Sequence, residues 1–156
     1  MVVDGSNANC HVRPVGARLG GVATKGRRVR EHEVSFSEAE WRARLTPAQF
    51  RVLREHGTER PFSGPAVAPD ADGRYCCAGC GAPLFDAETK FESGTGWPSF
   101  HDALPGSLER RRDFRMLIPR TEVCCRRCGG HLGHVFGDGP APTRKRYCIN
   151  ACALAP

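Results

Sequence analysis

Two pairs of cysteines have the spacing that metal sites use. Cys77 and Cys80 form one Cys-x-x-Cys pair, Cys125 and Cys128 form a second, and a glycine follows each pair. Glycine lets the backbone turn so that both sulfurs of a pair face one point. Four thiolates in a tetrahedral array suit Zn²⁺, and a site with four protein ligands has no open position for a substrate. The pattern therefore predicts one structural zinc ion per chain.

Two other interpretations of these cysteines stay open. The pairs are alternatively two disulfides or free thiols. Zinc could instead bind Cys125, Cys128, His131 and His134, but Cys/His fingers usually place about a dozen residues between the two ligand pairs.

A segment near the C-terminus, whose sequence is typical of a strand, carries a further cysteine. If this segment is extended, Arg146, Cys148, Asn150 and Cys152 share one face. A neighbouring cation favours the thiolate, and an amide can donate a hydrogen bond to an anionic intermediate. Upstream, His131 and His134 can move protons near neutral pH. These types of residue predict a redox or acyl-transfer site; the alternative is a buried structural cysteine with two surface histidines.

The loop from Ser93 to Phe100 contains a tryptophan between glycines and a proline. Pro98 restricts the backbone of Trp97, so the indole is either a core plug or the wall of a binding site. An aromatic wall suits a methyl or thioether group, because sulfur packs favourably at ring edges.

The composition restricts the class of protein. The chain has 156 residues, a formal net charge of +6 and nine cysteines, an odd number that excludes complete internal pairing. It contains no apolar run near the roughly 18 residues of a membrane helix, and we see no secretory signal. We therefore expect a cytoplasmic protein with no membrane partner, whose cysteines are metal ligands or reactive thiols.

The chain divides at its composition. Residues 1–34 are expected to be a flexible basic tail, and 35–156 a single domain. Capping-box patterns predict helices at Ser37–Leu45 and from Thr46 to about His56, ending at Gly57. Short strands separated by turns predict a mainly β core. We expect the strands at 74–77, 89–92, 113–119, 121–124, 134–136 and 146–151.

Several motifs together resemble the B-type peptide-methionine (R)-S-oxide reductases. The resemblance covers about residues 35–154. The matching segments are 45–64 (LTPAQFRVLREHGTERPFSG), the two cysteine pairs with 82–85 (APLF), 93–100 (SGTGWPSF), 131–140 (HLGHVFGDGP) and 146–150 (RYCIN).

The resemblance implies a fold of two small antiparallel sheets with short N-terminal helices and a zinc site distant from the active site. It implies that Cys148 attacks the sulfoxide sulfur of methionine-R-sulfoxide in oxidised proteins and becomes a sulfenic acid. His131 and His134 would position and protonate the sulfoxide oxygen. Arg146 and Asn150 would orient the substrate and tune the thiol.

The same resemblance implies three substrate-binding residues. Trp97, with Phe136 behind it, would form the wall against the methyl group, and Asp138 would orient a histidine or an arginine. The implied role is repair of proteins after oxidative stress, with thioredoxin or a small thiol as reductant, in a monomer that binds no nucleic acid.

One position departs from the family pattern. Many members carry a resolving cysteine where this chain has Thr95. In an extended strand Cys152 would lie about 13 Å from Cys148, too far for a disulfide unless the strand bends, whereas Cys10 on the tail could reach the site. We hypothesise direct reduction of the sulfenic acid, with Cys10 as the possible internal resolver. Cys76 and Cys124 adjoin zinc ligands and are expected to lie away from the active face.

The rival from another class is a zinc-stabilised, non-enzymatic binding module of the same fold type. Its basic charge would point to RNA or an acidic protein. Such a module has no need of the Arg146–Cys148–Asn150 face, and the basic segment 110–115 offers only Phe114 for stacking on bases.

Overall fold

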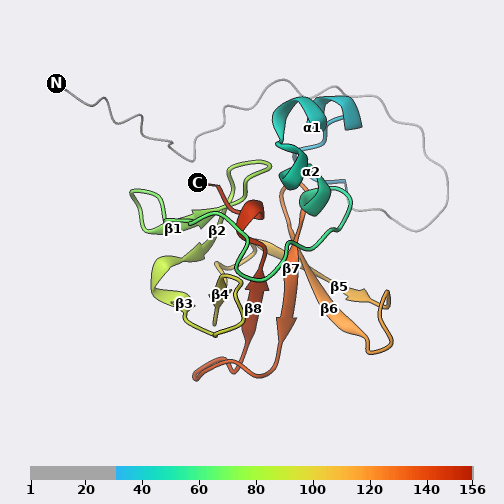
Figure 1. Ribbon diagram of the computed structural model, residues 1–156. Helices are drawn as coiled ribbons and strands as arrows, with labels where there is room; N and C mark the ends of the chain where they lie inside the picture. The colour runs from blue at the N-terminus through green and yellow to red at the C-terminus, as the bar shows by residue number, and fades with distance from the viewer. Residues whose placement is uncertain (1–30, 156) are drawn as a thin grey trace.

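The computed structural model describes residues 31–155, with two short helices beside a β structure (Figure 1). Helix α1 (Glu38–Arg44) begins at Ser37, whose hydroxyl accepts from the Glu40 N–H while the Glu40 carboxylate accepts from the Ser37 N–H. Helix α2 (Pro47–Leu53) repeats this capping box with Thr46 and Gln49. Both predicted helix starts are confirmed. Within the described residues, neither helix is long and apolar enough to cross a membrane.

The end of α2 differs from the prediction. The helix stops at Leu53, about three residues before His56. His56 adopts a left-handed backbone with φ of 56°, and the Gly57 N–H donates to the Arg51 carbonyl at 2.8 Å. This closing bond turns the chain out of the helix before His56, so the glycine ends the turn rather than the helix itself.

The predicted tail lies mostly outside the described residues. Its last members contact the domain: the His32 ring nitrogen Nδ1 lies 3.1 Å from the Arg126 carbonyl, and the Val34 N–H donates to the Arg127 carbonyl at 3.0 Å. The boundary at residue 34 therefore remains a proposal.

The strands form two antiparallel sheets, which confirms the predicted fold class. The small sheet pairs β1 (Arg74–Cys76) with β2 (Pro83–Asp86). The large sheet has the order β3-β4-β8-β7-β6-β5. Its strands are β3 (Lys90–Phe91), β4 (Ser99–Phe100), β5 (Leu108–Asp113), β6 (Arg120–Cys125), β7 (His131–Phe136) and β8 (Arg146–Ile149). Two short 3₁₀ helices, η1 (Ala87–Thr89) and η2 (Ala151–Ala153), follow β2 and β8.

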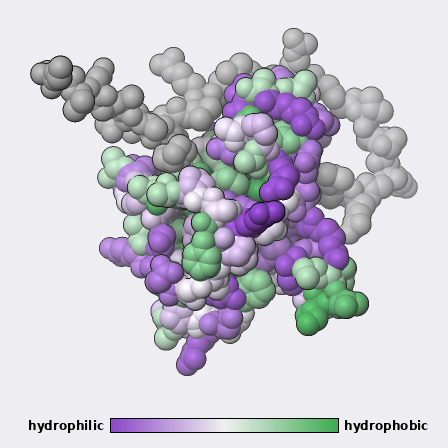
Figure 2. All heavy atoms as spheres, in the orientation of Figure 1, coloured by the Kyte–Doolittle hydropathy of each residue, from purple (hydrophilic) through white to green (hydrophobic). Residues whose placement is uncertain are grey.

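The strand predicted at 113–119 is wrong. The strand in this region is β5, which ends at Asp113 and pairs along its whole length with β6. Residues 114–118 form an exposed loop with an apolar tip, seen as the green group at the lower right of Figure 2. The apolar side chains of residues 114–118 suggested a strand. The charged segment 108–113 is the actual strand, because its backbone pairs with β6. Neither β2 nor β4 was predicted.

The large sheet separates the core from a polar face. Along β8, Tyr147 and Ile149 are buried, while Arg146 and Cys148 alternate with them on the opposite face and are partly exposed. On the core side, the ring of Phe85 from the small sheet stacks on Phe100 of β4 with centroids 4.2 Å apart. This packing fixes the two sheets to each other and leaves the face of Cys148 for chemistry.

Candidate functional site

The structure brings the four predicted zinc ligands together. Cys77, Cys80, Cys125 and Cys128 are buried, and their sulfurs all lie within 4.8 Å of one another. Two sulfur–sulfur distances are 3.8 Å (Cys77–Cys128) and 3.6 Å (Cys80–Cys125). A tetrahedral ion with Zn–S bonds of 2.3 Å requires a sulfur–sulfur edge of about 3.8 Å. The cluster therefore fits a tetrahedral metal ion.

The N-terminal helices cover this cluster. A methyl group on Gly130 would lie 3.0 Å from the Leu53 side chain and 3.3 Å from the Cys128 sulfur. Arg54, at the end of α2, donates to the Cys128 carbonyl at 3.1 Å. The helices and the two cysteine turns thus form one packing unit, whose stability depends on whatever holds the four sulfurs together.

Cys148 lies in a row of side chains that crosses the large sheet. The register pairs Ser99 with Cys148, Cys148 with His134, and His134 with Glu122. Directly opposed residues of antiparallel strands point to the same face. Sheet register thus sets a thiol beside an imidazole, and that imidazole beside a carboxylate.

The Cys148 thiol is free and partly exposed. Burial raises its pKa, while the charge of Arg146 and hydrogen bonds from Thr95 and Arg146 oppose that rise. Arg146 and Thr95, which stands at the position of the family's resolving cysteine, are thus the groups that favour the thiolate.

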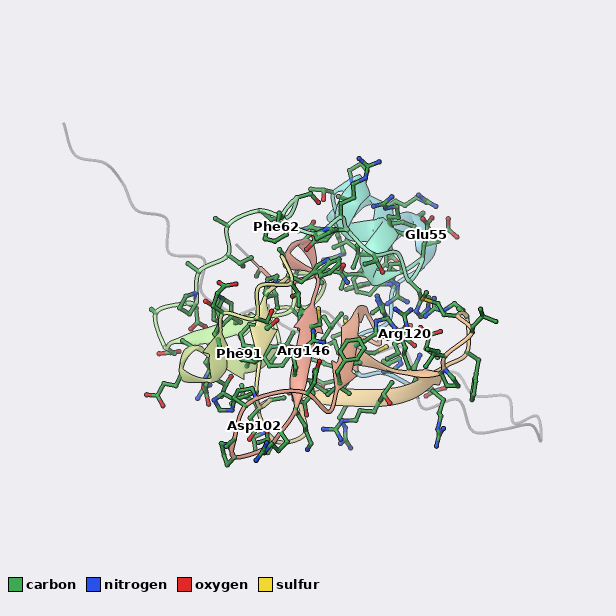
Figure 3. All side chains as sticks on the ribbon, turned by 60° about the horizontal axis from the view of Figure 1, so that its bottom comes forward. Glu55, Phe62, Phe91, Asp102, Arg120 and Arg146 are labelled. Carbon is green, nitrogen blue, oxygen red and sulfur yellow. The ribbon has the colours of Figure 1, made fainter. Side chains whose placement is uncertain are left out.

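Asp138 holds Arg146 in place. Its two carboxylate oxygens accept from Nε and Nη2 of Arg146, each at 3.0 Å. The guanidinium carbon lies 4.6 Å from the centroid of the Phe136 ring. Figure 3 shows Arg146 near the middle of the sheet, on β8. Phe136 thus packs against Arg146, and Asp138 binds an arginine, one of the two residue types that the resemblance implies for it.

Each predicted histidine is bound to a carboxylate that sequence reasoning missed. His131 Nδ1 lies 2.6 Å from Glu122 Oε1, and His134 Nε2 lies 2.8 Å from Asp113 Oδ2. His131 is fully buried, and its Nε2 has no hydrogen-bond partner among the described residues. Burial lowers the pKa of His134, although Asp113 opposes this effect. Since both imidazoles bind carboxylates, the alternative zinc set containing them is not the one that the structure assembles.

The two carboxylates have further partners. Burial raises the pKa of Glu122, but hydrogen bonds from His131 and His56 outweigh burial and hold that pKa well below its usual range. For Asp113, the hydrogen bond from Arg115 is the largest effect and also gives a strongly lowered pKa. Both groups are therefore anions at neutral pH. They come from β5 and β6, and no local pattern marked either carboxylate as a partner of a histidine.

Trp97 lies just before β4 begins, and Asn150 lies where β8 ends. The Ile149 N–H donates to the Pro98 carbonyl at 2.9 Å, which extends the pairing past Ser99 toward Trp97. Asn150 Nδ2 donates to the Leu132 carbonyl at 2.8 Å, so one of its two amide hydrogens is already used. Trp97 is partly buried, and its indole N–H donates to the Glu59 carbonyl at 3.2 Å.

The structure does not bring Cys152 to this face. The predicted strand end at residue 151 is wrong, because β8 ends at Ile149 and Cys152 lies in η2. Its sulfur faces α2, 4.0 Å from the Ala48 carbonyl. Burial, reinforced by the charge of Glu59, raises the pKa of Cys152 to about 12. The other candidate resolver, Cys10, lies outside the described residues.

A partly exposed thiol beside paired histidines defines a thiol-dependent redox site, on a β fold whose four-cysteine cluster could hold a metal ion. Comparisons with known proteins agree with this class. A family model described as the SelR domain matches residues 45–155, so the chain belongs to the SelR-domain family.

Curated relatives carry consistent names. The peptide methionine sulfoxide reductase MsrB of Methanosarcina barkeri is 57% identical over 122 residues, which cover 78% of this chain and 86% of the relative. The MsrB of Agrobacterium fabrum is 54% identical over 123 residues, 78% of this chain and 91% of the relative. The mitochondrial methionine-R-sulfoxide reductase B3 of Mus musculus is 46% identical over 145 residues, 92% of this chain and 57% of the relative.

Proposed function

We propose that this protein reduces methionine-R-sulfoxide in oxidised proteins to methionine, with Cys148 as the nucleophile. The observation that carries the proposal is the row formed by Cys148, His134 and Glu122, in which a free thiol faces histidines fixed by carboxylates. A binding module of the same fold would have no use for this arrangement.

The proposed reaction moves one oxygen atom. The Cys148 thiolate attacks the sulfoxide sulfur while an imidazolium gives a proton to the sulfoxide oxygen. The substrate's S–O bond breaks, the oxygen leaves as a hydroxyl group on Cys148, and methionine departs; the cysteine is oxidised to a sulfenic acid and the substrate sulfur is reduced. His131 suits the proton transfer, because Glu122 fixes its Nδ1 and leaves Nε2 without a protein partner.

The other site residues orient the substrate in this proposal. Trp97 and Phe136 supply the wall against the methyl group, and the Phe136 ring also packs against Arg146. Arg146 favours the thiolate and is held by Asp138. Asn150 and His134 fix the oxygen of the sulfoxide opposite Cys148. These roles agree with the register, which brings the ends of β4, β7 and β8 to one face.

Recycling of Cys148 is proposed to occur by direct attack of thioredoxin or a small thiol on the sulfenic acid. Thr95 beside the sulfur cannot form a disulfide. Cys152 faces α2, and its raised pKa leaves little thiolate to attack. Cys10 remains the possible internal resolver. Since the mechanism needs a free Cys148 thiol, we propose that the protein acts in the reducing cytoplasm. We also propose that it acts as a monomer.

We also propose that the four-cysteine cluster holds one Zn²⁺ ion. Cys77, Cys80, Cys125 and Cys128 would be its ligands, and the ion would supply structural cross-linking only. Their burial and spacing support a closed site with no position for substrate.

The test is turnover with separated epimers. Wild type and Cys148→Ser are incubated with the R and S forms of methionine sulfoxide in a peptide, with a dithiol as reductant. We expect reduction of the R epimer alone, and none by the variant. Equal activity in Cys148→Ser would overturn the mechanism, and no turnover by a folded wild type would favour the binding module.

A further inference from the structure

Glu59 lies outside the proposed site but contacts two of its residues. It belongs to the connection between α2 and β1 and is only 9% exposed. Its N–H donates to Asn150 Oδ1 at 3.0 Å, and its carbonyl accepts from Trp97 Nε1 at 3.2 Å. The backbone of a single residue thus binds two side chains that the proposed reaction places around the substrate.

The Glu59 carboxylate anchors this residue to the strand that carries Cys148. Its two oxygens accept from the N–H groups of Ala151 and Cys152, which directly follow β8 and Asn150. Hydrogen bonds to a carboxylate are stronger and shorter than those between neutral groups. Glu59 therefore follows the end of β8 closely, and any movement of one is transmitted to the other.

The rest of the segment presses against the same elements. The Phe62 N–H donates to the Gly96 carbonyl at 2.9 Å, next to Trp97. A methyl group on Gly64 would lie 2.8 Å from Glu59 Oε1 and 2.5 Å from the Ala151 side chain, so this close approach requires glycine. In Figure 3, Phe62 marks this segment on its way between the helices and the sheet. The chain from Glu59 to Gly64 thus connects the Trp97 loop to the end of β8 through hydrogen bonds and close packing.

We propose that Glu59 is a positioning residue that fixes Trp97 and Asn150 relative to Cys148, and thereby sets selectivity for the methyl sulfoxide of R configuration. The inference rests on the proposed function. The R and S epimers differ in where the oxygen lies relative to the methyl group, so selectivity requires the methyl wall and the oxygen partner to keep one mutual geometry. Glu59 is bonded to both partners and supplies that geometry.

Two substitutions and a matched control test this role. Glu59→Gln keeps both backbone bonds but replaces one carboxylate oxygen by an NH₂ group that cannot accept from an N–H. Glu59→Ala removes the anchor completely. The control is Glu92→Gln, since Glu92 is an exposed carboxylate that accepts from the Gly94 N–H in the same loop but is not bonded to Trp97 or Asn150.

The first readout does not depend on turnover. Trp41 and Trp97 are the two tryptophans, so 5-fluorotryptophan labelling gives two ¹⁹F resonances. Trp41 is the buried residue of α1, and its resonance reports whether the fold is intact. We expect Glu59→Gln and Glu59→Ala to shift or broaden the Trp97 resonance while that of Trp41 stays unchanged, and Glu92→Gln to move neither.

The second readout is kinetic. Misplacement of site groups by about 1 Å can lower rates by about 100-fold, so we expect kcat/KM for the R epimer to fall roughly 10- to 100-fold in Glu59→Gln, and the preference for methyl over ethyl sulfoxides to shrink. Glu92→Gln is expected to match wild type. Because Glu59 acts through Trp97, the effects of Glu59→Gln and Trp97→Phe on the free energy of activation for kcat/KM should be less than additive in the double variant. The effects of Glu92→Gln and Trp97→Phe should be additive.

Other results would overturn the inference. One is an unchanged Trp97 resonance with unchanged selectivity in folded Glu59→Gln; another is full additivity with Trp97→Phe. If Glu59→Ala fails to fold, Glu59→Gln alone decides. If wild type reduces neither epimer, the proposed function fails, and an unchanged Trp97 resonance would separately show that Glu59 does not position the indole.

Discussion

Substitution of one cluster cysteine, Cys80→Ser, is expected to unfold the protein under conditions where wild type is fully folded. The four sulfurs join the turn after β1 to the turn between β6 and β7, and α2 packs on them through Leu53. Binding of structural zinc contributes about 10–16 kcal/mol in small zinc domains, whereas domains of this size are stable by only about 5–15 kcal/mol in total. A site that loses one thiolate retains part of its affinity for zinc. Loss of even about half of the zinc-binding free energy, however, would remove most of the free energy of unfolding.

The assay measures metal content and stability on the same samples. Wild type should contain one zinc per chain by elemental analysis and lose its cooperative thermal transition when a strong chelator removes the metal. The matched control is Cys152→Ser, because Cys152 is also buried but its sulfur faces the Ala48 carbonyl, to which a serine hydroxyl can donate. We expect full zinc content and a change in stability of about 1 kcal/mol or less in this control. A metal-free wild type that unfolds at the same temperature as untreated protein would refute the reasoning.

Two further predictions concern the charges of the site. Arg146→Met should raise the pKa of Cys148 beyond its already raised value, because it removes the cation that favours the thiolate; alkylation of the thiol by iodoacetamide at pH 7 should slow by about 3- to 10-fold, and an unchanged rate would contradict the pairing. The pKa of Glu122 is lowered on folding, so the unfolded chain binds more protons below about pH 4.5. Wild type should therefore lose stability as the pH falls below that value, and Glu122→Gln should flatten this dependence in urea titrations; equal slopes for both proteins would argue against a buried Glu122 anion.

The features that sequence predicted are local ones. A capping box spans four residues, so Ser37 and Thr46 marked the two helix starts without knowledge of the fold. A Cys-x-x-Cys turn likewise depends on its own backbone, and each pair appeared as a ready half-site. Alternation along β8 placed Arg146 and Cys148 on one face correctly. In each case the determining contacts lie within one turn or one strand.

The features that sequence missed depend on pairing between distant strands. Glu122 meets His131 across nine residues, and Asp113 meets His134 across 21. Nothing near either carboxylate indicates a partner, because the register between β5, β6 and β7 creates the contact. The strand predicted over the hairpin tip at 114–118 was wrong for the opposite reason. The apolar residues of this segment are typical of a strand, but here they are exposed to solvent. The strand β5 becomes recognisable only when segment 108–113 is aligned as an antiparallel partner of β6.

The order of the strands also determines how the site manages its charges. Neighbouring strands lie about 4.8 Å apart, so Glu122 is about 10 Å from Cys148 with His134 between them. Both site carboxylates are anions, and an anion adjacent to the thiol would oppose formation of the thiolate. Here His131 binds one carboxylate, His134 binds the other, and Arg146 lies closest to the sulfur in the sequence. Glu122 and Asp113 thus lie two and three strands from Cys148, where they bind the imidazoles, whereas the nearer Asp138, whose charge raises the pKa of Cys148, is paired with Arg146.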